Sequence, residues 1–280
     1  MSNESEREQP DEESDSFAVK PMDGRPPAVW HTHADGTSHA QPEGRAGGTG
    51  QAQAAVVDRP ALQRIDVQVP LLDKNDRLAG RNRGFFKARG IAVLNLVSSP
   101  GSGKTTLLER TLDEFGKATR CAVVVGDLET DRDAQRLRRS HAPVAQITTG
   151  TACHLDAEMV ARGVEALDLD GVRILFIENV GNLVCPASFD LGESTRVVLL
   201  STTEGEDKPL KYPPIFKSAH VVLLTKIDVA EVLGFDRVAA ARNIRAIAPQ
   251  ARLIEMSARN GQGMAEWYEF LRSQTGTQPC

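Results

Sequence analysis

The sequence predicts an α/β fold with a mostly parallel, doubly wound sheet that carries helices on both faces. From Ile91 onward, short and nearly continuous apolar runs alternate with segments of helical periodicity. Such runs are typical of parallel strands that are buried on both faces. The stretch VSSPGSGKTTLLERTL, residues 97–112, follows the first apolar run and has the glycine spacing of a phosphate-binding loop.

The expected strands are the apolar runs at residues 91–97, 122–125, 144–147, 172–177, 196–200, 221–224 and 252–255. The expected helices repeat their apolar residues with a period near 3.6 and lie at residues 104–115, 132–139, 155–166, 235–248 and 264–271. Because the two kinds of segment alternate, residues 91–280 are assigned to one domain.

The first 90 residues differ from this domain. Residues 1–60 are rich in Glu, Asp, Ser, Gly, Pro and Gln and show little periodicity. They bury too little apolar surface to offset the entropy of ordering, so a disordered acidic and polar tail is expected. Residues 61–90 are assigned to an N-terminal helical extension, because Leu71, Leu72, Leu78 and Phe85 follow Pro70 near helical spacing.

Composition excludes several classes of protein. The chain of 280 residues has a formal net charge of −5, which argues against nucleic acid as the main partner. It has no run of ~18 apolar residues that would span a membrane. The acidic N-terminus lacks the apolar core of a secretory signal, so a cytoplasmic protein is expected. Its four cysteines are widely spaced and do not indicate a disulfide framework.

The glycine-rich stretch matches the phosphate-loop pattern G-x-x-x-x-G-K-S/T, except that Ser98 replaces the first glycine. Lys104 is expected to neutralise the β- and γ-phosphates and Thr105 to reach Mg²⁺. A chance Gly/Ser turn is disfavoured, because strand, loop, lysine, hydroxyl and helix occur together. The fold is therefore expected to be that of a P-loop NTPase. The expected phosphate contacts are Gly101, Ser102, Gly103, Lys104, Thr105 and Thr106.

Two further segments indicate guanine as the base. The sequence TKID, residues 225–228, contains Lys226 and Asp228 and resembles the guanine motif N-K-x-D. The Asp228 carboxylate can accept from both N1–H and N2–H₂ of guanine, and the Lys226 stem can cover the base. TKID alone is equally consistent with a charged strand end. Downstream, Ser257 and Ala258 resemble the S-A-K segment whose backbone N–H meets guanine O6, so that GTP is favoured over ATP.

Several longer stretches, taken together, resemble one family. The sequence ENVG, residues 178–181, lies where small GTPases carry D-x-x-G. With VVVGDLETDRDAQRLR, TTGTACHLDAEMV and STTEGEDKPLKYPPIFKSA, residues 65–275 resemble the HypB family of hydrogenase nickel-incorporation GTPases. The resemblance implies a GTP-dependent homodimer that helps insert nickel into nickel–iron hydrogenase. It also implies other hydrogenase maturation proteins and the hydrogenase large subunit as partners.

Two strand-end acids are candidates for Mg²⁺ beside the phosphate loop. Asp127 follows the second expected strand and Glu178 follows the fourth. Either carboxylate could hold Mg²⁺ alongside Thr105, directly or through water. A solvated acid or a helix cap is the alternative for each. The candidate catalytic residues are Lys104, Thr105 and Asp127.

The resemblance also implies a metal site at Cys153, His154 and Cys185, for Ni²⁺ or Zn²⁺. The first two are expected where a helix begins, a place that favours thiolate. Three ligands leave one position for water or for a second subunit. From spacing alone, two small buried cysteines and a satisfied histidine would be the preferred interpretation. Cys185 lies four residues beyond Gly181, in the loop expected to respond to the γ-phosphate.

Three functions remain open after this step. The chain is expected to be a slow GTPase that controls nickel delivery, a metal carrier for which nucleotide is only a conformational switch, or a urease-type nickel GTPase. The stretch ENVGNLVCP argues against the last, because the urease group is expected to carry C-P-H. No catalytic glutamine or arginine finger is evident, so intrinsic hydrolysis is expected to be slow. Only His31, His33 and His39 offer nickel ligands in the tail.

Overall fold

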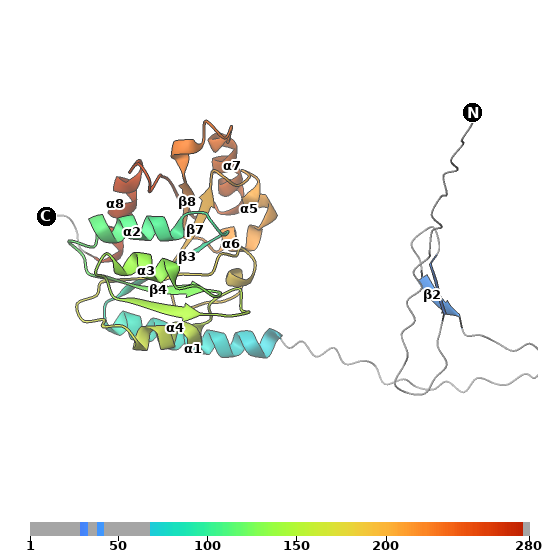
Figure 1. Cartoon of the computed structure of the whole chain (residues 1–280), viewed down its shortest axis with the longest axis horizontal. Helices are drawn as coiled ribbons and strands as arrows, with labels where there is room; N and C mark the ends of the chain where they lie inside the picture. The colour runs from blue at the N-terminus through green and yellow to red at the C-terminus, as the bar shows by residue number, and fades with distance from the viewer. Residues whose placement is uncertain (1–28, 33–37, 42–67, 277–280) are drawn as a thin grey trace, which may run out of the picture. The chain divides into compact units, whose positions relative to one another are not determined.

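The computed structural model describes residues 29–32, 38–41 and 68–276 (Figure 1). The chain divides into two units, Met1–Gln63 and Arg64–Cys280. In the first unit, strands β1 (Val29–Thr32) and β2 (Ser38–Gln41) pair antiparallel. These eight residues differ from the expected tail without regular structure, and the rest of that prediction lies outside the described residues.

The described part of the second unit contains a seven-stranded parallel sheet in the order β5-β4-β6-β3-β7-β8-β9. Its strands are β3 (Ala92–Ser98), β4 (Cys121–Asp127), β5 (Val144–Thr148), β6 (Ile174–Glu178), β7 (Thr195–Ser201), β8 (Val221–Thr225) and β9 (Arg252–Glu255). The predicted parallel α/β sheet is confirmed.

Helices cover both faces of this sheet, as predicted (Figure 1). They are α1 (Gln68–Ala88), α2 (Lys104–Glu114), α3 (Arg132–Arg138), α4 (Ala157–Glu165), α5 (Lys208–Lys211), α6 (Pro213–Lys217), α7 (Arg237–Ile247) and α8 (Met264–Gln274). Helices α2, α3 and α8 pack into one apolar cluster. Helices α1 and α4 pack on the opposite face beside each other, and α6 and α7 extend that face over β7 and β8.

The strand order changes direction at β3. The chain passes from β3 to β4, returns to β6 beside β3, and then continues on the other side with β7. In parallel α/β sheets the carboxyl ends of strands at such a switch point form the ligand crevice. Ser98, Asp127 and Glu178 all lie at the carboxyl ends of strands, and they meet at this edge.

Short helices were not predicted. Helices α5 and α6 have only one turn each, too short for a periodic pattern, and prolines occupy their first turns, where the missing N–H costs nothing. Two 3₁₀ turns were not predicted either. One, Cys185–Ala187, contains a candidate metal ligand, and the other, Ile227–Val229, contains the candidate guanine-binding Asp228. Across the described ranges, no helix combines the length and the apolarity that crossing a bilayer requires.

Candidate functional site

The phosphate loop connects β3 directly to α2. Gly101 has φ 72° and Gly103 has φ 100°, both in the left-handed region that glycine adopts without strain. Gly103 is the N-cap of α2, and Lys104 is the first helical residue. The positive end of α2 therefore faces the loop, an arrangement that suits an anion.

Lys104 is buried, and its ammonium has a neutral neighbour. Lys104 Nζ donates to Ser98 Oγ at 2.9 Å, and Ser102 Oγ donates to the same atom at 2.5 Å. Burial lowers the pKa of Lys104, and nearby carboxylates, Glu178 first, oppose that shift. A buried cation held by a hydroxyl gains strongly from an anionic partner, and this is what phosphate oxygens supply.

Thr105 and Glu178 form the candidate Mg²⁺ site. Thr105 Oγ1 donates to Glu178 Oε1 at 2.7 Å, whereas the buried Glu178 Oε2 has no hydrogen-bond partner among the described residues. Burial raises the pKa of Glu178 to about 7, against the opposing effects of Lys104 and Thr105. An unpaired buried carboxylate oxygen beside a threonine hydroxyl fits the oxygen ligands that Mg²⁺ prefers. Asp127 lines the same cavity, where its carboxylate accepts from Thr130 Oγ1 at 3.0 Å.

This phosphate cavity has a volume of about 490 Å³. Its lining includes Asp133 and Arg136 of α3, which were not predicted. Arg136 is ion-paired with Glu109, and its Nη2 donates to Thr106 Oγ1 at 3.3 Å. Asp133 and Arg136 have no distinguishing sequence pattern and resemble the charged face of any surface helix. Only the packing of α3 against α2 brings them to the cavity.

A second cavity of about 310 Å³ adjoins the first and shares Gly103, Thr106 and Lys226 with it. The residues predicted to recognise guanine gather in this base cavity, which is lined among others by Lys226, Asp228, Ser257 and Ala258. Its position next to the phosphate loop is the one that a nucleoside triphosphate requires.

Contacts from distant residues hold the base cavity in place. Lys226, at φ 58°, donates from Nζ to the Gly101 carbonyl at 2.7 Å. Thr225 Oγ1 donates to the Ser102 carbonyl at 2.8 Å, so the residue that replaces asparagine ties TKID to the phosphate loop. Arg110, which was not predicted, donates to the Ala258 carbonyl at 3.0 Å.

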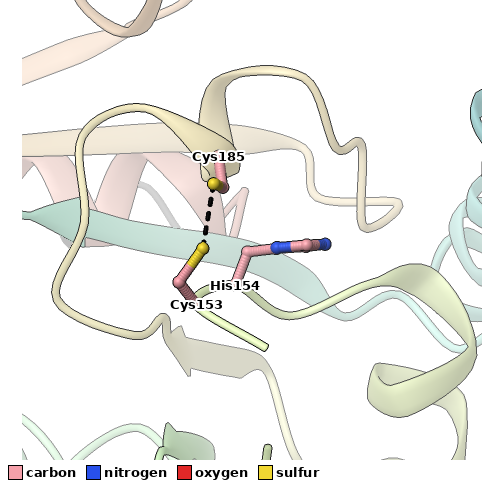
Figure 2. A group of neighbouring side chains, drawn as sticks. All are labelled: Cys153, His154 and Cys185. Atoms are coloured by element: carbon pink, nitrogen blue, oxygen red, sulfur yellow. Dashed lines mark hydrogen bonds between the residues drawn. The ribbon is translucent and has the colours of Figure 1, made fainter. Parts of the chain in front are cut away.

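The three candidate metal ligands come together in the structure. Figure 2 shows the sulfur atoms of Cys153 and Cys185, from two segments, facing each other, with His154 beside Cys153. Cys153 Sγ donates to Cys185 Sγ at 2.9 Å, and one ligand atom from each residue lies within 4.8 Å of the other two. This geometry favours the ligand interpretation over three unrelated side chains.

Within the trio, the shifted pKa of His154 favours metal binding and the shifted pKa of Cys185 opposes it. His154 Nδ1 is buried and has no hydrogen-bond partner in the described part of the chain, and the ring lies 3.9 Å from that of Phe189. Burial lowers the pKa of His154, which favours the neutral imidazole that binds metals. The hydrogen bond from Cys153 raises the pKa of Cys185, so a metal ion bound by Cys185 must displace the proton of that thiol.

The helix expected at residues 155–166 is present but begins two residues later than predicted. Helix α4 begins at Ala157, and its N-cap is Asp156, whose carboxylate accepts from the Met159 N–H at 2.7 Å. Cys153 and His154 therefore lie in the turn before the helix. The expected lowering of a thiol pKa by the helix start loses its basis, because Asp156 occupies the position that the thiolate would need.

The loop after β6 contacts both candidate sites. A Cβ on Gly181 would lie 2.9 Å from Pro100 Cα, so this glycine packs directly against the phosphate loop. Asn182 Nδ2 donates to the Cys153 carbonyl at 3.3 Å, and its Oδ1 accepts from the Val184 N–H at 2.9 Å. One short loop thus connects the nucleotide cavity to both cysteine segments.

Comparison with known proteins gives consistent matches. A family model for the nucleotide-binding domain of CobW, HypB and UreG proteins matches residues 92–255. The hydrogenase maturation factor HypB of Escherichia coli is 50% identical over 227 residues, which are 81% of this chain and 78% of that protein. The hydrogenase/urease maturation factor HypB of Helicobacter pylori is 41% identical over 79% of this chain and 93% of that protein.

Two solved structures share the fold at substantial sequence identity. HypB from Helicobacter pylori in complex with nickel aligns with a TM-score of 0.69 and 41% identity, over 72% of this chain and 95% of that one. HypB from Archaeoglobus fulgidus aligns with a TM-score of 0.69 and 39% identity, over 72% of this chain and 99% of that one.

Proposed function

The chain belongs to the HypB family of hydrogenase maturation factors, and on this premise we propose that it is a GTP-hydrolysing nickel metallochaperone for nickel–iron hydrogenase. A metal site whose ligands are set by bound nucleotide would release or accept nickel as GTP is hydrolysed. The observation that carries this proposal is the loop at Gly181 and Asn182, which packs on the phosphate loop and hydrogen-bonds the Cys153 segment.

GTP is the proposed nucleotide, because the base cavity offers Asp228 as acceptor for guanine N1–H and N2–H₂. Ser257 and Ala258 line the same cavity. The Ser257 N–H donates to the Gln262 carbonyl at 2.8 Å, so the Ala258 N–H is the proposed donor to guanine O6. Adenine has no N1–H, so it would leave the carboxylate without these partners.

Mg²⁺ is the proposed cofactor, held by Thr105 and Glu178 with Asp127 nearby. When bound, it would neutralise phosphate charge. Lys104 would exchange the Ser98 hydroxyl for a phosphate oxygen, and Arg136 adds a second cation at the cavity wall. The described lining of the phosphate cavity includes no glutamine to orient water, which supports slow intrinsic hydrolysis.

Nickel is the proposed cargo of Cys153, His154 and Cys185, with Zn²⁺ as a competing ion. Two thiolates and an imidazole suit both ions. Three ligands leave a coordination position for water or for a second copy of the chain, so we propose a GTP-dependent homodimer. The proposed partners are other hydrogenase maturation proteins and the hydrogenase large subunit, in the cytoplasm.

The test is a titration of the GDP form and of a non-hydrolysable GTP-analogue form with Ni²⁺ and Zn²⁺. The two nucleotide forms should bind nickel with different affinities, because Cys185 follows the loop that packs on the phosphate loop. Cys153→Ala and Cys185→Ala should each weaken binding by at least ~10-fold, the lower range for disturbing a metal site. Cys121→Ala is the matched control, because Cys121 is a buried cysteine outside the trio. Unchanged affinity in both trio variants would refute the cargo site.

Two alternatives are separated by simple measurements. A carrier that uses nucleotide only as a switch would bind nickel normally but release no more than one phosphate per subunit. A urease-type role deserves a test because the Helicobacter pylori relative is named for both enzymes. Nickel transfer to apo-hydrogenase but not to apo-urease would decide for the proposed function.

A further inference from the structure

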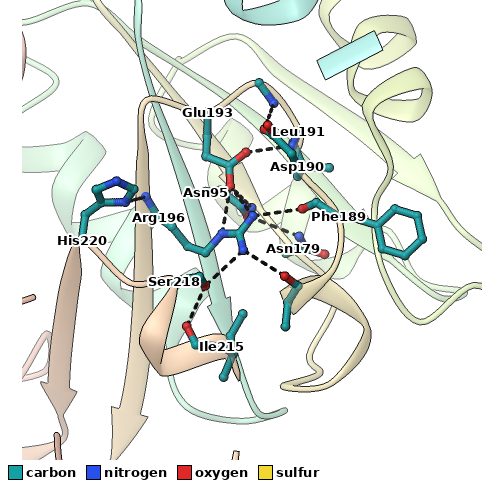
Figure 3. A network of polar contacts seen from close by, with 12 residues as sticks. Asn95, Asn179, Phe189, Asp190, Leu191, Glu193, Arg196, Ile215, Ser218 and His220 are labelled. Atoms are coloured by element: carbon teal, nitrogen blue, oxygen red, sulfur yellow. Dashed lines mark hydrogen bonds and ion pairs between the residues drawn. The ribbon is translucent and has the colours of Figure 1, made fainter. Parts of the chain in front are cut away.

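Four polar side chains form a continuous buried network around strands β3, β6 and β7 (Figure 3). They are Asn95 on β3, Asn179 directly after β6, Glu193 before β7 and Arg196 on β7, and we call them the polar bridge. Their exposed fractions are 0%, 1%, 9% and 7%. Burying an ion pair is costly and often adds no stability over an apolar core, so its presence calls for another explanation.

Arg196 holds the segment that follows Cys185. All five guanidinium N–H groups find acceptors: Nε and Nη2 donate to Glu193, Nη1 to Ser218 and the Ala187 carbonyl, and Nη2 also to the Phe189 carbonyl at 3.0 Å. The Phe189 ring in turn packs on His154 at 3.9 Å between centroids. Arg196 thus holds in place the segment 185–189, which carries Cys185 and which we call the first arm of the metal site. The second arm is the Cys153–His154 segment.

Glu193 and Asn95 carry the network across the sheet. Glu193 Oε1 accepts from Asn95 Nδ2 at 3.2 Å, and its Oε2 accepts from the Leu191 N–H at 2.8 Å. Asn95 Oδ1 accepts from Asn179 Nδ2 at 3.3 Å. Asn95 contacts neither candidate site, so it is the internal link of the bridge.

Asn179 ends the bridge at the other metal arm. Its Oδ1 accepts from the N–H of Leu155, the residue after His154, at 3.1 Å and from the Val180 N–H at 2.9 Å. Asn179 also follows Glu178 directly and lines the phosphate cavity. The same side chain therefore contacts the Cys153–His154 segment and the start of the loop that packs on the phosphate loop.

We propose that the polar bridge positions both arms of the Cys153, His154 and Cys185 site and couples their separation to the nucleotide. Its buried donors and acceptors are mutually satisfied, so a shift at Asn179 must be followed by Asn95, Glu193 and Arg196 or leave a polar group unpaired at a cost. This inference rests on the proposed function. It adds four positioning residues that bind neither ion nor nucleotide through their side chains.

The test uses Asn95→Leu, which keeps the number and branching of the side-chain heavy atoms but cannot form hydrogen bonds and so cuts the bridge. The control is Thr195→Val, which removes the 3.0 Å hydrogen bond from Thr195 Oγ1 to Gln274 on the same region of sheet. Thr195 neighbours Arg196 along β7, and successive side chains on a strand point to opposite faces. Asn95→Leu loses two buried hydrogen bonds and Thr195→Val loses one, and only the first variant interrupts the bridge.

The readout is the ratio of Ni²⁺ affinities in the GDP and GTP-analogue forms, together with the nickel–thiolate absorption band. Asn95→Leu should move this ratio ~3–10-fold toward one, within the range for mutations along a coupling network. The absorption bands of its two nucleotide forms should become alike. Thr195→Val should keep the unmutated ratio and the unmutated difference between bands.

Arg196→Lys is the second variant and covers the case in which Asn95→Leu does not fold. Lysine has three donors against the five that Arg196 uses, so the carbonyls of Ala187 and Phe189 should lose their partners. The ratio should again approach one. Unmutated ratios in the folded bridge variants would overturn the inference but leave the proposed function intact. A ratio of one in the unmutated protein would instead overturn the proposed nucleotide control, and the inference with it.

Discussion

At the scale of single residues, two departures from the usual nucleotide motifs acquire defined contacts. Ser98, in place of the first glycine of the loop, accepts hydrogen bonds from Lys104 and Ser102. Thr225, in place of the asparagine of N-K-x-D, donates to the Ser102 carbonyl. Both substitutions therefore keep the phosphate loop attached to its surroundings by a hydroxyl group.

Asp228→Asn should change base selectivity. The amide presents a donor where guanine N1–H and N2–H₂ also donate, so GTP binding should weaken by ~1–3 kcal/mol, the range for a lost bidentate base contact. Xanthosine triphosphate should bind better relative to GTP, because its base offers the complementary acceptor. Calorimetric titration with GTP, xanthosine triphosphate and ATP measures this, with exposed Glu231→Gln as the control. Equal ATP and GTP affinity in the unmutated protein would contradict guanine recognition.

Glu178 should make stability depend on pH. Burial raises its folded-state pKa from 4.5 to about 7. The folded protein then binds a proton that the unfolded chain releases, so this contribution to stability is complete below pH 4.5 and is lost as the pH rises to about 7. Glu178→Gln stays neutral. Relative to the unmutated protein, its free energy of unfolding should rise over this window by at most ~3 kcal/mol.

Urea unfolding of the nucleotide-free protein at several pH values measures this effect. Glu165→Gln serves as the control, because Glu165 is exposed on the last turn of α4. Parallel pH profiles for Glu178→Gln and the unmutated protein would show that the Glu178 carboxyl keeps its ordinary pKa in the fold.

At the scale of elements, the loop after β6 has little freedom. Its Gly181 lies against Pro100 of the phosphate loop, and its Asn182 donates to the Cys153 carbonyl. Helix α1 adds a constraint from the other side, because Asn82 Nδ2 donates to the Ala157 carbonyl at 2.8 Å and to the Leu191 carbonyl at 3.1 Å. Helix α1 thus connects the segment after Cys153 and His154 to the segment after Cys185.

Gly181→Ala should weaken the connection between phosphate loop and metal site. The added Cβ would lie 2.9 Å from Pro100 Cα and 3.0 Å from Pro100 N, and backbone must move to relieve this contact. The expected cost is ~1–3 kcal/mol of stability, typical of overpacking. The nucleotide-dependent difference in nickel affinity should also shrink.

Thermal unfolding and nickel titration with GDP and with a GTP analogue measure both effects. Gly84→Ala is the matched control, because a Cβ on Gly84 in α1 meets no atom within 4 Å. If Gly181→Ala behaved like Gly84→Ala in both measurements, the loop would be able to move without disturbing the phosphate loop.

At the scale of the whole molecule, the proposed nucleotide site and the candidate metal site lie at one edge of the sheet, and exposed apolar side chains lie next to both. Leu128 beside Asp127 is 41% exposed, and Val184 beside Cys185 is 61% exposed. A second copy of the chain could cover these side chains and supply the missing metal ligand.

The oligomeric state should therefore depend on nucleotide. The GTP-analogue form should show a higher mass by light scattering than the GDP form at equal protein concentration. Asp228→Asn should need more GTP analogue for the same change, because it binds guanine more weakly. Identical masses for the two forms across a concentration series would reject nucleotide control of assembly.

Local sequence determined the elements of this protein. The strand runs were predicted to within a few residues, because apolar continuity and strand burial are properties of adjacent positions. The link between GSGKT and the start of α2 was also local, since Gly103 and Lys104 set the dihedral angles and the charge there. Helices α5 and α6 escaped prediction because a single turn has no period to detect.

Only the tertiary structure decided which of these elements meet. Cys153 and Cys185 lie 32 residues apart in sequence, and the family resemblance, not their spacing, had indicated that they meet. No sequence pattern near the polar bridge predicts its contacts. Arg196, for example, is a single charged residue within an apolar run, and nothing beside it identifies Asn95 or Glu193 as its partners. Their contacts exist because β3 lies between β6 and β7, and the order of strands depends on burial across the whole sheet, which no single segment encodes.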